Sequence, residues 1–231
     1  MILSVIEALF RIFLIILRRD KVIENNIRLC FPNLTDHQIL EIKNRCIKFY
    51  TRAIYELITF KIFRKSWLLA NVRTSDLPKF HPSRPAFLLS GHFSNFEILL
   101  QLTDHLDRKV YFFAKPFKPL FLFKLYTKLR TSKNSEWFSG LIRLKELMKK
   151  NQCVGFIFDQ HVPKEKGIVT SFFGVPSTFP KFLLSFIKNF QPQVFFVNLR
   201  FNGEFYSLNF QEIDLSDNDS EENIASRLNQ L

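Results

Sequence analysis

Short apolar segments that alternate with helix-like segments constrain the fold of this 231-residue chain more than any other feature. Three of them, at residues 86–90, 110–114 and 154–158, have the length and composition of buried strands. Two more strand-like segments, 194–201 and 205–210, flank Asn202-Gly203, a hairpin signal. Strands that alternate with helices predict an α/β fold, with a layered central mixed sheet flanked by helices.

Apolar residues at three- to four-residue spacing and capping residues predict the helices. They cover residues 3–18, 35–63, 94–105, 118–129, 138–150 and 180–190. The sheet is therefore preceded by N-terminal helices. The stretch from Asp159 to Thr178 contains Gly167, Gly174 and Pro176, and it is expected to be a loop.

The charge of the chain is strongly basic but unevenly spread. The net charge is +12, yet residues 212–222 hold six acids, so residues 1–211 carry 32 bases and 15 acids. Such a field attracts anions, which include nucleic acid, an anionic membrane, an acidic carrier protein and a phosphorylated substrate. A solvated, lysine-rich surface is the simpler alternative.

The composition of the chain reduces the number of expected partners. The 29 Phe residues occur in runs with Leu and Ile, and the chain has no helix-turn-helix signature or zinc finger, so nucleic acid is not an expected partner. The three cysteines, Cys30, Cys46 and Cys153, have no C-x-x-C spacing. They therefore form neither a disulfide framework nor a zinc site, and we interpret them as buried small hydrophobic residues in a reducing compartment.

The first 17 residues are strongly apolar, but Glu7 and Arg11 interrupt them. The segment is too short and too charged for a typical membrane-spanning helix, and it lacks the features of a signal peptide. Glu7 and Arg11 can pair on one helix face, and Arg18, Arg19 and Lys21 follow. This pattern favours an anchor at an anionic membrane interface, and an ordinary buried first helix is the alternative.

The clearest chemical signal follows the strand at residues 86–90. In α/β sheets the functional crevice lies at the carboxyl ends of the strands, and Gly91-His92 occupies this place. If His92 lies in the turn and Glu97 in the first helical turn, the carboxylate can orient the imidazole, which then accepts a proton from a hydroxyl. Alternatively, Ser94 and Glu97 form a capping box, and both roles are structural.

His-x4-Glu resembles the His-x4-Asp/Glu signature of the lysophospholipid/glycerolipid acyltransferase superfamily. More narrowly, the chain resembles the bacterial lipid A biosynthesis acyltransferases, the lauroyl/myristoyl transferases. The resemblance covers about residues 20–210. It is carried by "NNIRLCFPNLTDHQI", "LLSGHFSNFE", Arg130 after a helix, and "VGFIFDQHVPKEKGIVTSFFGVPST".

The resemblance implies an O-acyltransferase that moves a fatty acyl chain from acyl carrier protein to a hydroxyl of a lipid A precursor, without a metal or other cofactor. It implies that His92 is the general base and Glu97 its partner. The implied substrate-binding residues are Asn95, Arg130, Asp159, Gln160, Phe173 and Gly174. From the residues alone, Arg130 could be a solvated residue, Asp159 a turn residue, and Phe172 and Phe173 part of an acyl groove or of the core.

The implied organisation is an N-terminal membrane-interface helix at residues 1–19, an acyltransferase domain at residues 20–211 and an acidic C-terminal tail at residues 212–231. The expected location is the cytoplasmic face of the inner membrane. Two alternatives remain open: a lysophospholipid or another glycolipid as acceptor, and a shortened, catalytically silent membrane-surface protein of the same fold.

Overall fold

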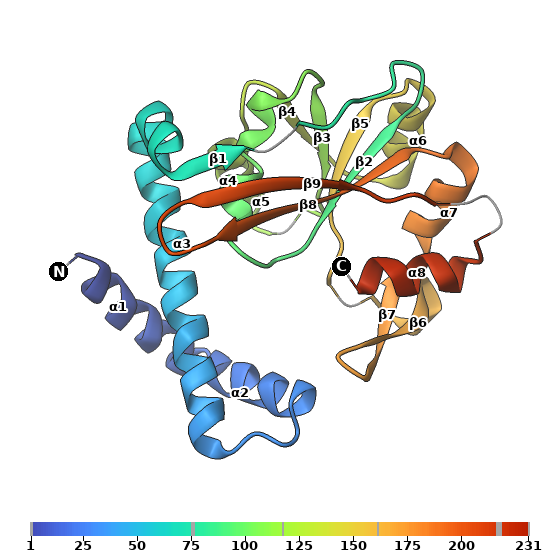
Figure 1. Cartoon of the computed structure of the whole chain (residues 1–231). Helices are drawn as coiled ribbons and strands as arrows, with labels where there is room; N and C mark the ends of the chain where they lie inside the picture. Colours follow the sequence, from blue (N-terminus) through green and yellow to red (C-terminus); the bar gives the residue numbers. More distant parts are fainter. Residues whose placement is uncertain (1, 75–76, 117, 161, 216–218, 231) are drawn as a thin grey trace. The chain divides into compact units, whose positions relative to one another are not determined.

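The computed structural model describes residues 2–74, 77–116, 118–160, 162–215 and 219–230, with the side chains of 2, 58, 61–65, 68–69, 122, 125–126 and 129 left aside. The fold is α/β, as the sequence predicts (Figure 1). The chain divides into two compact units. The first is Met1–Arg64 with Phe172–Val175, and the second is Lys65–Ser171 with Pro176–Leu231. This division does not coincide with the expected boundaries after residues 19 and 211.

The first unit is built from helices α1 (Ile2–Ile16), α2 (Arg19–Cys30) and most of α3 (Asp36–Asn71). The pairing predicted for the first helix is confirmed, because the Arg11 guanidinium lies 2.7 Å from Glu7 and also donates to Asn44 of α3. Lys43 of α3 pairs with Glu24 of α2 at 3.3 Å. Helices α1 and α2 thus each make a polar contact with α3.

Most of the apolar surface of α1 is exposed. Leu14 is buried, whereas seven other apolar side chains are 41–71% exposed: Leu3, Val5, Leu9, Ile12, Phe13, Ile15 and Ile16. The alternative of an ordinary buried first helix therefore does not describe α1. Across the described residues, no helix combines the length and the apolar character needed to cross a bilayer.

A seven-stranded sheet forms the centre of the second unit. Its order is β1 (Val72–Thr74), β9 (Tyr206–Glu212), β8 (Gln193–Phe201), β2 (Ala86–Ser90), β5 (Cys153–Ile157), β3 (Val110–Phe113) and β4 (Ser135–Phe138). Strands β8, β2, β5, β3 and β4 are parallel, and β9 is antiparallel to β8. A separate two-stranded sheet joins β6 (Gly167–Phe172) and β7 (Val175–Pro180).

The connections between these strands are mostly helical. They are α4 (Phe96–Leu99), the 3-10 helix Leu102–His105, α5 (Leu120–Arg130), α6 (Leu141–Lys149), the 3-10 turn Lys164–Lys166, α7 (Lys181–Phe190) and α8 (Glu221–Asn229).

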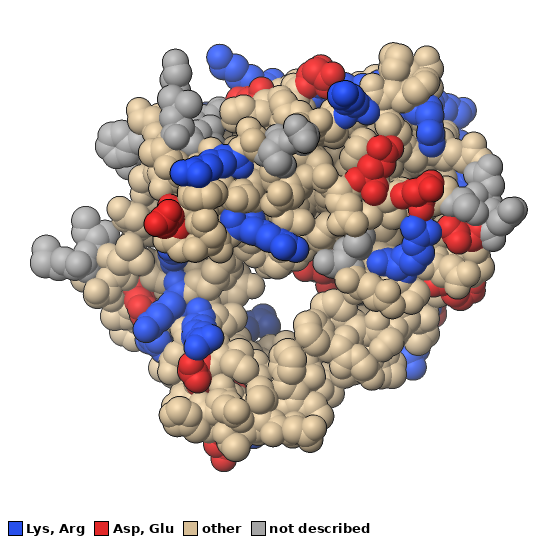
Figure 2. Space-filling model, in the orientation of Figure 1, with Lys and Arg blue, Asp and Glu red and all other residues tan. Residues whose placement is uncertain are grey.

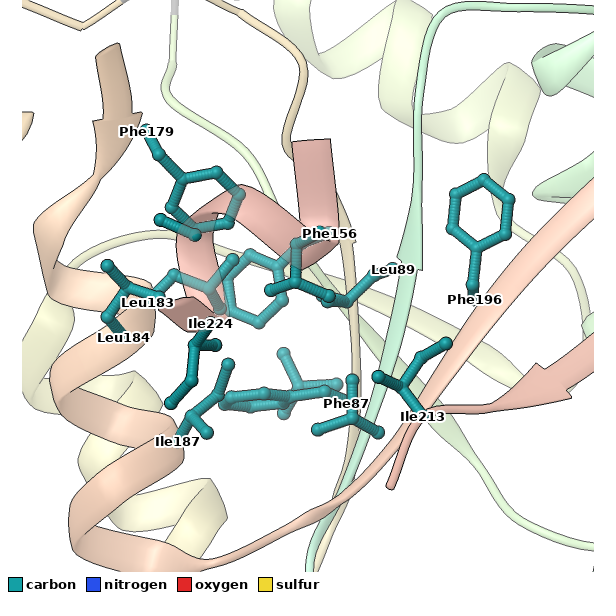
Figure 3. Close-up of a cluster of buried hydrophobic side chains, with 14 of the residues drawn as sticks. Phe87, Leu89, Phe156, Phe179, Leu183, Leu184, Ile187, Phe196, Ile213 and Ile224 are labelled. Carbon is teal, nitrogen blue, oxygen red and sulfur yellow. The ribbon is translucent and has the colours of Figure 1, made fainter. Parts of the chain in front are cut away.

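Successive side chains of the strands point to opposite faces of the sheet, where they pack into two separate hydrophobic clusters. In β2, Phe87 and Leu89 join one cluster, whereas Ala86 and Leu88 join the other. This two-residue alternation is the geometry of a strand covered on both faces. Figure 3 shows the first cluster, in which side chains of α7 and α8 pack on those of β2 and β5.

The C-terminal segment is more ordered than an acidic tail. Its helix α8 is capped by Ser220, whose side chain accepts a hydrogen bond from the backbone N–H of Asn223. Ile224, Ala225 and Leu228 are buried in the first core cluster. The acidic tail was predicted from the charges of residues 212–222, and the prediction missed the apolar face that these three residues form on α8.

Three local predictions differ from the structure. The helix expected at residues 94–105 is a short α4 followed by a 3-10 helix, and the loop expected at residues 159–178 contains β6 and β7. The hairpin at Asn202 is confirmed, but its connection has four residues, because the Asn202 side chain accepts bonds from the backbone N–H groups of Glu204 and Phe205.

The cysteines are free, but only Cys153 is buried. Burial in β5 raises the pKa of the Cys153 thiol to about 12. Cys30 and Cys46 are partly buried, so the interpretation of all three as core residues is wrong for these two.

The docking of α8 can be tested by truncating one of its core side chains. We expect Ile224→Ala to lower the free energy of unfolding by about 2–5 kcal/mol, because it leaves a cavity in the first core cluster. Ser226→Ala, on the exposed face of the same helix, should change it by less than about 0.5 kcal/mol. Urea unfolding measures both values, and equal effects would show that α8 is not docked.

Candidate active site

The site lies where two neighbouring parallel strands end. Ser90 of β2 is in register with Ile157 of β5, and the Phe158 backbone N–H donates to the Ser90 carbonyl at 3.0 Å. The residues that follow each strand, His92 and Asp159, therefore leave the sheet side by side. Carboxyl ends of parallel strands are the usual position of functional crevices in α/β sheets.

His92 and Asp159 form a two-point contact. The His92 ring Nδ1 lies 2.7 Å from Asp159 Oδ1, and the His92 backbone N–H donates to Asp159 Oδ2 at 2.6 Å. Both side chains are 33% exposed. Because an ionised carboxylate only accepts hydrogen bonds, Nδ1 carries the proton and Nε2 holds the free lone pair. Gln160 approaches this second nitrogen, with its amide nitrogen at 3.4 Å.

The electrostatics of Asp159 suit this pairing. Partial burial raises the pKa of its carboxyl, but the hydrogen bonds from the His92 ring and backbone outweigh burial, so the pKa lies below its usual value. Asp159 is therefore ionised at neutral pH, where it fixes the ring tautomer and stabilises the imidazolium form.

Gly91 is required by the close approach of the two segments. A Cβ atom at Gly91 would lie 2.9 Å from Asp159 Oδ2 and 2.7 Å from the Phe93 ring. Carbon atoms are not found this close to such neighbours, so any larger residue would displace the Asp159 carboxylate or the Phe93 ring. The glycine that precedes His92 thus sets the geometry of the His92–Asp159 pair.

Glu97 lies elsewhere than the sequence predicts. Its carboxylate pairs with the Arg130 guanidinium, and the two side chains are 16% and 8% exposed. The Arg130 guanidinium also lies 5.5 Å from the Phe96 ring centre and 5.8 Å from that of Trp137. The expected contact of Glu97 with His92 is thus replaced by a buried ion pair with Arg130, and Asp159 takes the place beside the imidazole. Arg130 is not the solvated residue of the alternative interpretation.

The capping-box interpretation is also wrong. Ser94 has a φ of 52°, and the cap of α4 is Asn95, whose side chain accepts from the Ile98 backbone N–H at 3.4 Å. Asn95 is fully buried. The structure therefore places Asn95 at a helix start, whereas the sequence analysis expected it to contact substrate.

A cavity of about 420 Å³ opens beside the imidazole. Its polar lining comes from His92, Arg130, Gln160 and Lys115. Aromatic side chains supply most of the remaining wall: Phe96, Phe112, Phe113, Phe123, Trp137, Phe156, Phe158 and Phe182. An apolar cavity of this size with a few convergent polar groups is typical of a small-molecule or lipid site.

Phe173 and Gly174 are not among the residues that line this cavity, whereas Lys115, which the sequence analysis did not single out, lines it. Phe173 and Gly174 form the turn between β6 and β7, and Phe173 is 56% exposed, so it belongs neither to an acyl groove of the described cavity nor to the core. Lys115 was missed. It follows β3 closely, and the same strand-end argument that identified His92 would have found it.

Among the described residues, no three His, Cys, Asp or Glu side chains are grouped to hold a metal ion. The second unit is an α/β domain with a histidine–carboxylate pair whose histidine lines an aromatic cavity.

Comparison with known proteins gives the family. The model of the bacterial lipid A biosynthesis acyltransferases matches residues 1–231, so the chain belongs to this family. No curated protein matches the chain. The family makes the protein an acyltransferase of lipid A biosynthesis.

The role of Gly91 can be tested in the folded protein. We expect Gly91→Ala to weaken the hydrogen bond between the His92 ring and Asp159, because the added Cβ pushes on the Asp159 carboxylate. Proton NMR of the His92 Nδ1–H should show an upfield shift or loss of the signal through solvent exchange. Phe93→Ala, which removes the other neighbour of that Cβ, should leave the signal in place. An unchanged signal in Gly91→Ala would contradict the close-approach argument.

Proposed function

We propose that this protein transfers a fatty acyl chain from the thioester of an acyl carrier protein to a hydroxyl of a lipid A precursor, with His92 as the general base. The observation that carries the proposal is the His92–Asp159 pair, whose imidazole lines the aromatic cavity. Membership of the lipid A acyltransferase family supports the reaction class.

His92 Nε2 accepts the proton of the acceptor hydroxyl while the hydroxyl oxygen attacks the thioester carbonyl carbon. The carbon–sulfur bond then breaks, and the carrier thiolate leaves with the proton that His92 had taken. Asp159 stabilises the imidazolium between these two steps. The products are the ester and the free carrier thiol.

The positive groups of the cavity suit negatively charged reactants. Arg130 and Lys115 line it, and Glu97 holds the Arg130 guanidinium in place. A guanidinium can bind an oxyanion or a phosphate through two parallel hydrogen bonds. The acyl chain of the donor can pack against the aromatic wall of the cavity. Burial of each CH₂ group there contributes about 0.8 kcal/mol to the free energy of binding.

The proposed location is the cytoplasmic face of the inner membrane, with α1 at the interface. The exposed apolar side chains of α1 and the cations Arg18, Arg19 and Lys21 directly after it support this location. The basic residues of the chain also complement an acidic carrier protein, which is the proposed donor.

The acceptor can be identified by mass spectrometry of lipid A from cells that lack this protein. We expect one acyl chain to be missing, and we expect wild type but not His92→Ala to restore it. The mass difference gives the chain length. If lipid A is unchanged in all strains, the lipid A acceptor is contradicted, and turnover of purified protein on lysophospholipids would identify the alternative acceptor.

The partner of His92 can be tested by two matched amide substitutions. We expect Asp159→Asn to lower kcat by about 10²- to 10⁴-fold, because the amide no longer stabilises the imidazolium. Glu97→Gln should lower kcat by less than about tenfold, since Gln can still accept a hydrogen bond from Arg130. Steady-state kinetics on the purified variants measures both, and the reverse order of effects would make Glu97 the partner.

A further inference from the structure

The turn between β6 and β7 presents two large apolar rings to solvent. Phe172 is 45% exposed and Phe173 is 56% exposed, and their ring centres lie 4.8 Å apart in a T-shaped contact. Figure 2 shows a mostly uncharged surface over the hairpin. Adjacent exposed aromatic rings are unusual on a soluble surface and typically mark a contact site.

The backbone conformation of this turn is unfavourable for Phe173. Phe173 has a φ of 50° and Gly174 a φ of 75°, which is the pattern of a two-residue type I′ turn. Asn-Gly and Asp-Gly suit this turn, whereas a bulky aromatic residue at positive φ is strained. Phe173 adds little to the core in return, because more than half of its side chain is exposed. Hairpin stability therefore does not explain why an aromatic residue occupies the turn.

The ring at the turn also belongs to the helical unit. Phe172–Val175 cluster with the first unit, and Phe173 packs edge-on against Phe31, at the end of α2, with ring centres 5.4 Å apart. Phe31 is itself 42% exposed, and Leu29 is 59% exposed. The hairpin tip and the end of α2 thus form one apolar patch of Phe31, Phe172 and Phe173, which we name the tip patch.

The charge of the same unit indicates what covers the tip patch. Residues 1–64 hold 11 Lys and Arg against 6 Asp and Glu, and Arg18, Arg19 and Lys21 are exposed. Exposed aromatic rings on a basic unit are the combination that binds at the interface of an anionic bilayer, where rings enter the headgroup region and cations remain at its surface.

We propose that the tip patch is a second membrane contact, in which Phe172 and Phe173 insert into the interface of an anionic bilayer. The patch is separate in sequence from α1 and separate from the residues that line the cavity. The proposal rests on the membrane location given above but not on acyl transfer, because vesicle binding requires neither donor nor acceptor.

The test is co-sedimentation of the full chain with vesicles of phosphatidylethanolamine and phosphatidylglycerol at 3:1. We expect Phe172→Ser with Phe173→Ser to lower the partition coefficient about tenfold or more, because two rings lose their transfer from water to lipid. Phe172→Leu with Phe173→Leu should keep it within about threefold of wild type. The matched control is Leu141→Ser with Ile142→Ser, which removes side chains that are 47% and 82% exposed on α6. The partition coefficient of this control variant should stay within about twofold of the wild-type value.

Thermal unfolding of each variant checks the fold, and the Phe-to-Ser pair should keep the wild-type Tm within a few degrees. Wild-type binding by a folded Phe-to-Ser pair would overturn the proposal, and so would an equal loss in the α6 control. A change of oligomeric state without lipid, together with unchanged vesicle binding, would assign the patch to a second copy of the chain and overturn it as well. Vesicle binding by His92→Ala at the wild-type level separates this result from any failure of the proposed reaction.

Discussion

The parallel pairing of β2 with β5 is the constraint on which the site depends. The register of the two strands aligns Ser90 with Ile157. The loops that follow them therefore start side by side, and His92 of one loop contacts Asp159 of the other. A shift of one residue would turn every side chain of a strand to the opposite face, which would exchange the two cores and separate His92 from Asp159. The aromatic packing of both faces and the geometry of the His92–Asp159 pair thus depend on the same ladder of hydrogen bonds.

Much of the fold could be predicted because its signals are local. Strand β2 is found at the predicted residues, and α1 and α3 begin close to the expected positions. Helix α2 was missed because it is largely polar and is held by ion pairs such as Lys43–Glu24, which only the folded chain brings together. The β6–β7 hairpin was missed because its turn holds Phe173-Gly174 in place of Asn-Gly.

Part of the site could also be predicted from local signals, because several of its residues directly follow predicted strands. His92, Asp159 and Gln160 follow strands, so the strand-end rule places them at one edge. The partner of each group could not be derived from spacing. Glu97 is five residues from His92, but it pairs with Arg130, which is 33 residues away. Proximity in sequence favoured Glu97, whereas the carboxylate that contacts the imidazole is that of Asp159, 67 residues from His92.

The strand order also sets the order in which the protein can form during synthesis. The central strands β2, β5 and β8 are separated by long stretches of chain, so the sheet closes only after residue 193 and its neighbours have left the ribosome. Contacts among the N-terminal helices, such as Arg11–Asn44 and Lys43–Glu24, need only the first part of the chain, so they can form early. A nascent chain therefore carries α1, α2 and α3 well before β8 can join β2 in the sheet.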